Sequence, residues 1–365
     1  MCRQVPSAYV IDKRGGFRYE EHGGWRIWCV HPGERKVVDH RKAETRMAIL
    51  AGIDEAGFGP LLGPLVVSSA AFAVEPALLD VDLWQVFVRS VGKCRKYLAG
   101  RLLIADSKKA FDREEGMGHL ERTALVALDC MGKRPSDLMG LLAVLCPDCL
   151  SRLAGYAWYQ DLQECRLADG SNDQRIAARV FFEDLKAHQA SLSHMRACCV
   201  DVAHFNRMVK RIRNKAQVLF IVVTQLIQDL LTAFPREDIR IQIDRQGGRT
   251  HYRENLLRSF PEMELAVLEE SEERSDYELR DGTRIVRLTF EVKADDRYLA
   301  VSLASMISKY LRELLMERMN VYFAKLDAGL KPTAGYWQDG QRFVHELRTR
   351  LPHMAIDEER LVRCR

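Results

Sequence analysis

Two neighbouring carboxylates, Asp54 and Glu55, are the first residues of this sequence whose types and setting could do chemistry. They end the apolar run 48–53 and precede a turn that contains Gly57 and Gly59. Glycines let backbone N–H groups approach a ligand closely, and carboxylates are hard oxygen ligands for Mg²⁺. Since neighbouring strand residues point to opposite faces, we expect Asp54 on the sheet and Glu55 at the turn. A solvated acidic strand end is the alternative.

The same design of an apolar run that ends in an acid recurs twice. The alternating run 239–243 ends at Asp244 and is followed by glycines, and 284–292 leads through Lys293 to Asp295 at the start of a helix. An ordinary helix cap is the alternative for Asp295. Phosphodiester hydrolysis with two metal ions needs converging carboxylates, with the ions roughly 3.5–4 Å apart. We therefore predict that these acids converge.

Hydroxyl and ammonium groups accompany the acids. Ser107, Lys108 and Lys109 directly follow a short apolar run, where a helix cap is the alternative interpretation. In the helix expected up to residue 326, Ser305 and Lys309 are four residues apart and share one face. A surface pair between Lys309 and Glu313 is the alternative there.

The composition is that of a globular protein. The 365 residues are 47% hydrophobic and 29% charged, with a net charge of +4, which permits a polyanionic partner without demanding one. No run approaches the roughly 20 apolar residues that span a bilayer, so we expect no membrane partner. The ten cysteines show no regular spacing and follow no apolar leader, which favours free thiols in the cytoplasm over disulfides or a zinc site.

The chain is expected to contain one large domain with two additions. Residues 1–46 read as a loosely attached extension with a small hairpin around 25–30, and 351–365 as a tail. Within 47–350, residues 112–192 read as an inserted helical subdomain. Helices are also expected over 76–98 and over 205–234, the latter with a basic first part that could contact phosphate.

Taken together, these motifs resemble those of the ribonuclease HII family. The resemblance spans roughly residues 47–345, and the third catalytic acid of the family corresponds to Asp244. Its other motifs correspond to Gly52-Ile53-Asp54-Glu55-Ala56-Gly57 with Gly59-Pro60 and Gly63-Pro64, to Asp106-Ser107-Lys108-Lys109, to Lys293-Ala294-Asp295, to Ala304-Ser305 through Lys309, and to Gly335-Tyr336.

The resemblance implies an α/β fold, with an RNase H-like mixed sheet flanked by helices. It implies an endonuclease that uses Mg²⁺ or Mn²⁺ to cleave the RNA strand of RNA/DNA hybrids, or ribonucleotides embedded in DNA. Nucleic acid would be the partner; protein partners stay unknown. The implied catalytic and metal-binding residues are Asp54, Glu55, Asp244 and Asp295, and the implied substrate-binding residues are Gly57, Phe58, Gly59, Ser107, Lys108, Lys109, Ser305, Lys309 and Tyr336.

Two positions depart from the family pattern. Phe58 replaces the basic residue of the family's Gly-Arg-Gly loop, and Ala334 replaces the lysine before the Gly-Tyr pair. Both changes remove a cation that could hold substrate, whereas all four acids are kept. A nucleic-acid-binding protein without turnover, and a nuclease for another structured nucleic acid, are therefore the alternative functions.

Overall fold

The computed structural model describes residues 10–11, 17–21, 24–28, 47–111, 116–168, 172–354 and 357–364. The chain forms two compact units, 1–46 and 47–365. In the first unit β1 (Val10–Ile11), β2 (Phe17–Glu21) and β3 (Gly24–Trp28) form an antiparallel sheet. The segment 25–30, expected to form a hairpin by itself, instead contributes to one strand, β3, which pairs with β2; residues 29 and 30 lie outside the described residues.

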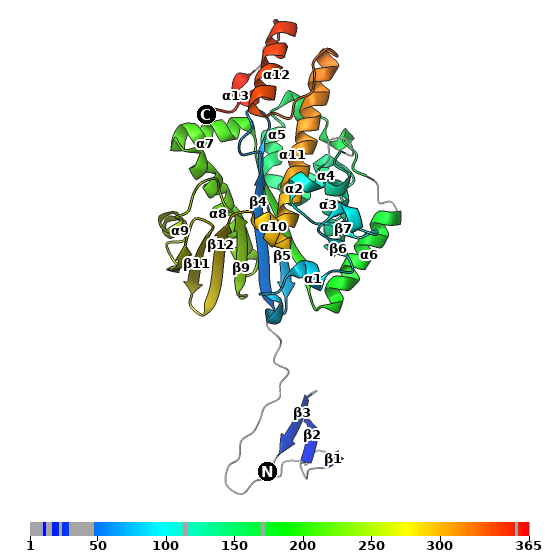
Figure 1. Ribbon diagram of the computed structural model, residues 1–365, viewed down its shortest axis with the longest axis vertical. Helices are drawn as coiled ribbons and strands as arrows, with labels where there is room; N and C mark the ends of the chain where they lie inside the picture. Colours follow the sequence, from blue (N-terminus) through cyan, green and yellow to red (C-terminus); the bar gives the residue numbers. More distant parts are fainter. Residues whose placement is uncertain are drawn as a thin grey trace, which may run out of the picture. The chain divides into compact units, whose positions relative to one another are not determined.

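The second unit is built on a seven-stranded mixed sheet in the order β10-β11-β12-β9-β4-β5-β8 (Figure 1). Strands β12, β9 and β4 run parallel, and the other pairings are antiparallel. The mixed sheet with flanking helices that the sequence predicts is confirmed. Its strands are β4 (Ala48–Ala56), β5 (Leu65–Val74), β8 (Ser191–Val200), β9 (Ile239–Asp244), β10 (Glu264–Glu270), β11 (Arg274–Asp281) and β12 (Arg284–Glu291).

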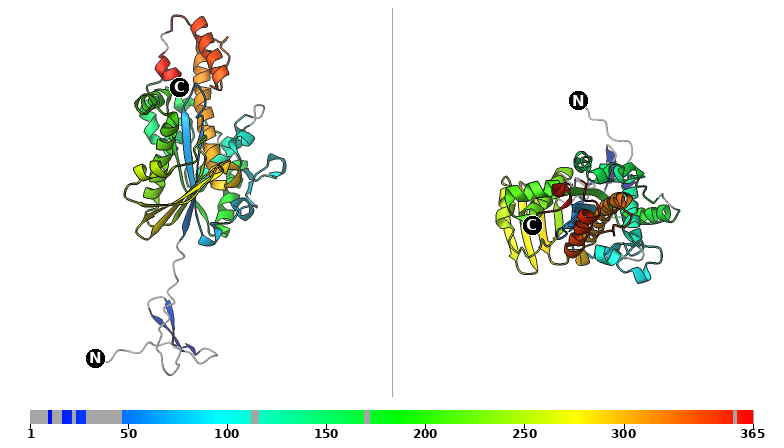
Figure 2. Two further views of the ribbon diagram at one scale, coloured as in Figure 1. Left: turned by 60° about the vertical axis from the view of Figure 1, so that its left-hand side comes forward. Right: turned by 90° about the horizontal axis from the view of Figure 1, so that it is seen from above.

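Helices cover both faces of this sheet (Figure 2). Alternate residues of β4 face opposite sides, so Ile49, Ala51 and Ile53 share a core with α8 (Lys215–Ala233), whereas Leu50 shares one with α11 (Leu299–Leu326). The remaining helices are α1 (Leu83–Val86), α2 (Ser107–Ala110), α3 (Gly118–Cys130), α4 (Leu138–Leu145), α5 (Leu150–Leu153), α6 (Asn172–Ala187), α7 (Val202–Ile212), α9 (Arg253–Ser259), α10 (Ala294–Arg297), α12 (Trp337–Arg350) and α13 (Glu358–Leu361).

The segment predicted as a helical insertion contains α3 to α6 in its described residues, with short 3₁₀ turns between them. It does not form a core of its own. Leu125, Leu142 and Phe181 belong to the same hydrophobic cluster as Val66 of the sheet and Leu303 of α11. The insertion therefore thickens the layer that covers the α11 face of the sheet.

The helix predicted over 76–98 is wrong. The segment holds only two 3₁₀ turns, the four-residue α1 and the strand β6 (Val91–Gly92), which pairs with β7 (Leu102–Leu103). A tertiary contact accounts for the break, because the buried carboxylate of Asp184 accepts hydrogen bonds from both the backbone N–H and the hydroxyl of Ser90.

The long helix predicted over 205–234 is divided into α7 and α8. Arg213 has a left-handed backbone (φ 55°), and the side chain of Asn214 caps α8 by accepting from the N–H of Gln217 at 3.1 Å. Helix α8 is also long and apolar enough to cross a membrane by length and composition, contrary to the sequence prediction. Half of that stretch is buried, and residues such as Val222 and Ile227 pack on the sheet as a core helix does.

The segment 351–365 belongs to the second unit rather than hanging from it as a tail. Helix α13 packs with α12 and the last turns of α11 through Leu361, Phe343 and Phe323. Eight cysteines of the described part of the chain are free thiols. The cytoplasmic location stays a prediction.

The contact between β4 and α11 yields a stability test at Gly52. A Cβ atom at this position would lie 2.1 Å from the backbone nitrogen of Val301, so Gly52→Ala must push the helix off the strand. We expect a loss of roughly 1–3 kcal/mol in the free energy of unfolding, measured by denaturant titration. Gly118→Ala, which has open space around its Cβ at the start of α3, is the control and should cost nothing. Equal stability of the two variants would contradict the close contact.

Candidate active site

Asp54 and Asp244 lie at the carboxyl ends of two adjacent parallel strands. Ile53 of β4 aligns with Ile243 of β9, so the next residues, the two acids, fall in the same row and on the same face. Asp54 is buried, with 6% of its surface exposed, and Asp244 is half-buried. Since the preceding isoleucines face α8, both acids point toward the α11 side of the sheet.

The third stretch is joined to this row by a backbone contact. After β12, Lys293 takes a left-handed conformation (φ 57°), and the N–H of Ala294 donates to the Asp244 carboxylate at 2.9 Å. Asp295 follows in the first turn of α10, which has no side-chain cap. Ser302 of α11 donates to the carbonyl of Asp295. Asp295 therefore does not act as a helix cap; the turn places it beside Asp244.

The charges of the four acids act on one another. Burial raises the pKa of Asp54, and the charges of Glu55, Asp244 and Asp295 raise it further. Burial and then Asp244 raise the pKa of Glu55 to about 7. Burial followed by Asp106 and Asp244 raises the pKa of Asp295 to about 6, and burial raises the pKa of Asp244. The structure thus brings the four predicted acids into one electrostatic neighbourhood.

Glu55 differs in position from the expectation. Strand β4 continues to Ala56, so Glu55 is a strand residue opposite Val67 and not part of the turn. Its side chain nevertheless reaches the cluster at the strand end, because the charges of Asp244 and Asp295 both raise its pKa. Its own backbone N–H donates to the Asp54 carboxylate at 2.7 Å.

Helix α11 holds Asp54 in place through the hydroxyl groups of two serines. Ser308 donates to the backbone carbonyl of Asp54 at 3.0 Å and contacts the hydroxyl of Ser68 at 2.9 Å. The hydroxyl oxygens of Ser305 and Ser107 lie 3.0 Å apart, and a hydrogen bond from Ser305 opposes the rise in the pKa of Asp54. These small side chains allow the close packing seen at Gly52.

The segment 106–109 places a cation beside the acids. The exposed Lys108 lowers the pKa values of Glu55, Asp244 and Asp295 by its charge, although burial prevails in each case. Asp106, rather than Ser107, caps α2 by accepting from the N–H of Lys108 at 2.8 Å. Lys109 pairs with Asp296.

Lys309 forms the pair with Glu313 that the sequence analysis gave as the alternative to substrate binding. Its ammonium pairs with Glu313 at 2.7 Å and stands 4.8 Å from the centre of the Phe111 ring. It is therefore engaged inside the protein, and its role toward substrate stays a prediction.

Two buried arginines that the sequence analysis did not identify hold the glycine loop. Arg312 of α11 donates to the carbonyl of Ala334 at 2.9 Å, and a Cβ on Gly57 would lie 2.4 Å from its Nε. Arg363 donates to the carbonyls of Gly57 at 2.5 Å and Gly63 at 2.8 Å. Burial and then the charge of Arg312 lower the pKa of Arg363 to about 9. Nothing in the sequence distinguishes Arg363 from an ordinary solvated arginine.

The predicted substrate-binding residues around this loop differ in exposure. Gly59 is exposed, with open space around it, whereas Phe58 is half-buried against the α8 core. Tyr336 is 53% exposed, and the guanidinium of Arg312 lies 5.8 Å from its ring centre. The carbonyl of Gly335 accepts from the N–H of Leu61 at 2.8 Å. This hydrogen bond holds the residue before Tyr336 against the glycine loop.

Two further acids belong to the neighbourhood. Asp106 is the largest charge acting on the pKa of Asp295, and it stands in the same motif as Ser107. Glu291 aligns with Asp244 on β12 and is buried, but it accepts hydrogen bonds from Arg297 and Tyr298. Its place at a strand end was a signal that sequence reasoning did not use.

The four predicted acids, Asp54, Glu55, Asp244 and Asp295, suit a hard divalent cation by chemistry. They supply only oxygen donors, and none of these four forms an ion pair with a described residue. Their side chains lie farther apart than the ligands of a metal site. Among the described residues, no group of three or more His, Cys, Asp or Glu side chains is gathered closely enough to hold a metal ion. Metal binding by these residues stays a prediction.

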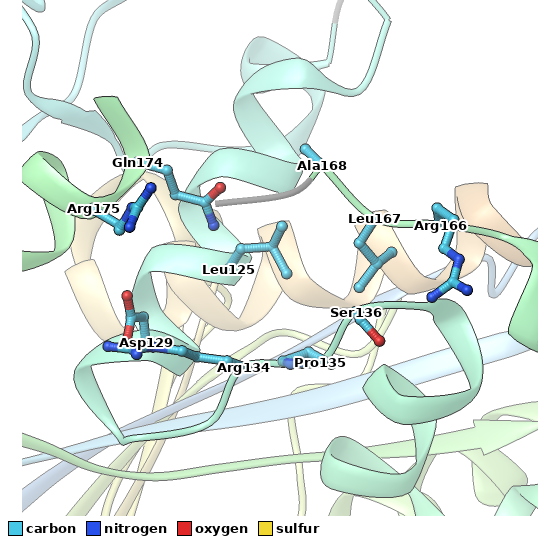
Figure 3. A pocket seen from close by; sticks show the side chains of 10 residues that line it. All are labelled: Leu125, Asp129, Arg134, Pro135, Ser136, Arg166, Leu167, Ala168, Gln174 and Arg175. Carbon is cyan, nitrogen blue, oxygen red and sulfur yellow. Dashed lines mark hydrogen bonds and ion pairs between the residues drawn. The ribbon is translucent and has the colours of Figure 1, made fainter. Parts of the chain in front are cut away.

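A cavity of about 600 Å³ lies elsewhere, within the insertion (Figure 3). None of the predicted site residues lines it. Its Arg134 pairs with Asp129 at 2.6 Å, and Arg166 approaches Asp137 at 3.8 Å. Because these guanidinium groups are compensated and distant in the fold from the carboxylate row, we assign the candidate active site to the row.

A mixed sheet flanked by helices, with acids toward the ends of its central parallel strands, defines a mixed α/β protein with a candidate acidic site. Residues 265–343 match the family model of ribonuclease HII. The resemblance to that family is confirmed there, in a segment that contains Asp295, Ser305, Lys309 and Tyr336. No match was found among curated protein sequences.

Several solved structures are similar to the chain at low identity. A structure of the PCNA:RNase HII complex from Archaeoglobus fulgidus has 16% identity and a TM-score of 0.40, covering 87% of this chain and 94% of that chain. Bst-RNase HIII in complex with Mn²⁺ has 14% identity and a TM-score of 0.41, covering 98% and 86%. Ribonuclease H2 from Pyrococcus horikoshii OT3 has 15% identity and a TM-score of 0.36, covering 86% and 92%.

The raised pKa of Glu55 predicts a pH-dependent loss of stability in metal-free protein. Because its folded-state pKa of about 7 exceeds the ordinary 4.5, its contribution is fully present below pH 4.5 and is lost as the pH rises through 7. Relative to Glu55→Gln, the free energy of unfolding of the parent should fall by roughly 1–3 kcal/mol between pH 4.5 and 8, measured in chelator. Parallel curves for the two proteins would contradict the prediction.

Proposed function

We propose that this protein is a metal-dependent endonuclease that hydrolyses the RNA strand of RNA/DNA hybrids, or ribonucleotides embedded in DNA. The observation that carries the proposal is the convergence of acids from three distant stretches of the chain. The pairing of Ile53 with Ile243 aligns Asp54 with Asp244, and the N–H of Ala294, next to Asp295, donates to the Asp244 carboxylate. The family match over 265–343 supports ribonuclease H-like function.

The chain's own groups divide the work of such a reaction. The four carboxylates would hold Mg²⁺ or Mn²⁺; when bound, the ions would activate water and neutralise charge on the leaving oxygen. Lys108, exposed beside the acids, would hold a phosphate of the substrate. Ser305 and Ser308 keep Asp54 in place from α11. Tyr336, half exposed beside the glycine loop, would pack on a sugar.

The absence of a closed ligand group among the described acids favours a second function, nucleic-acid binding without turnover. Phe58 and Ala334 point the same way, because each replaces a cation of the family pattern. The intact set of acids favours the nuclease. A cleavage assay on an RNA/DNA hybrid and on a duplex with one embedded ribonucleotide separates the two.

Asp54→Asn is the first test of the catalytic assignment. Removing one charge from the centre of the cluster should lower cleavage at least roughly 100-fold, the scale for loss of a catalytic group. Asp161→Asn, an exposed acid in the insertion, is the matched control and should keep full activity. Cleavage that survives in Asp54→Asn at the parental rate would refute the site; no cleavage by the parent, together with retained binding, would establish the second function.

Metal dependence has its own readout. Treatment with a chelator should abolish cleavage, and Mg²⁺ or Mn²⁺ should restore it. Either ion should also raise the melting temperature at pH 8, because it relieves repulsion among ionised carboxylates. In Asp54→Asn the rise should be smaller. If neither ion changes the melting temperature of the parent, metal binding is contradicted.

A further inference from the structure

Beside the glycine loop, the junction of α7 and α8 forms a groove in which the predicted loop residues Phe58 and Gly59 lie with cations that the carboxylate site does not use. One cavity of about 700 Å³ is lined by Phe58, Arg213, Asn214 and Lys215. A second, of about 220 Å³, is lined by Phe58, Gly59 and Lys215 together with part of the C-terminal segment. The two cavities share Phe58 and Lys215, so they form one continuous surface that begins at the loop after Glu55.

We propose that this groove binds the sugar-phosphate backbone of a nucleic-acid strand that runs past the carboxylates. The inference rests on the proposed function, which requires such a strand, and assigns Arg213 and Lys215 as its phosphate contacts. Arg213 is exposed, Lys215 is half-buried, and neither forms an ion pair with the described residues. The neighbouring Lys210, by contrast, is compensated by Glu359.

Lys215 occupies a position that folding alone disfavours. It is the first residue of α8, whose first turn contains no acidic side chain. A helix N-terminus carries partial positive charge, so a cation there is unfavourable and an anion is favourable. A phosphate at this point would be attracted by Lys215, by Arg213 and by the free N–H groups of the first turn together.

Another guanidinium, that of Arg249, lies near the start of α8. Arg249, in the loop after β9, contacts Gln217 of α8 at 3.4 Å and lies 5.2 Å from the centre of the Phe220 ring. Its Nη1 atom is buried without a hydrogen-bond partner in the described structure. Because Arg249 lines neither cavity, Arg213 and Lys215 are the cations assigned to phosphate.

Phe58 and Gly59 suit the same occupant. An aromatic ring beside cations is the usual arrangement for binding a strand without reading its sequence, since every base or sugar offers a face to the ring. Gly59 has open space where its Cβ would be, so the fold does not require glycine there. The cation lost at position 58 of the family pattern is thus replaced from a neighbouring element by Lys215.

The test measures binding in the cleavage-deficient Asp54→Asn chain, with a labelled RNA/DNA hybrid as the probe. Arg213→Ala combined with Lys215→Ala should weaken binding roughly 10-fold and lower the slope of log affinity against log salt by about 1–2. The control, Lys133→Ala combined with Arg179→Ala, removes the same charge from exposed positions of the insertion. It should change neither quantity by as much.

Phe58→Leu provides a second arm that keeps the apolar packing while removing the ring. It should weaken binding several-fold with no change in the salt slope, because no charge is lost. The groove assignment is overturned if the Arg213 and Lys215 variant binds like its parent, or if the control variant loses as much. Absence of cleavage by the unmodified chain would instead refute the proposed function and leave this binding result intact.

Discussion

Burial of like charges at the ends of β4 and β9 is the constraint on which the rest of the structure depends. Parallel pairing puts Asp54 and Asp244 in one row, and the low exposure of Asp54 prevents water from screening their repulsion. The nearby groups each offset part of it: the Ala294 N–H bonds to Asp244, and Lys108 contributes its charge to three of the acids. The fold tolerates this repulsion among the carboxylates because neighbouring elements are held in place around them.

That fixing comes from the other end of the sequence. Gly52 lets the backbone of α11 lie against β4, which brings Ser305 and Ser308 to Asp54. Arg312 and Arg363, two buried guanidinium groups, then connect the glycine loop to residues 334–335 and to the C-terminal segment. The motifs of the first and last parts of the chain therefore form one structure, and a change in α11 or near residue 363 acts on the position of the loop.

The sequence predicted β4 and β9 from a local signal, because an apolar run that ends in a carboxylate identifies each strand without knowledge of the fold. The catalytic role of the acids stays a prediction. Sequence reasoning failed where tertiary contacts override local preference. Asp184 breaks the helix expected over 76–98 by binding Ser90, and Arg213 divides the one expected over 205–234. The buried Arg363 could not be foreseen, because an arginine near a chain end is ordinarily a solvated charge.

The loop that follows β4 lines the groove at the α7–α8 junction, and the cations of this groove are opposite in charge to the carboxylate row. Ionised acids repel a polyanion, so a strand approaching Asp54 needs cations beyond the row itself. Lys108 supplies one beside the acids, whereas Lys309 is engaged by Glu313 and position 58 carries no charge. In the proposed function, cations at Arg213 and Lys215 would supply attraction along the loop, where position 58 carries no charge.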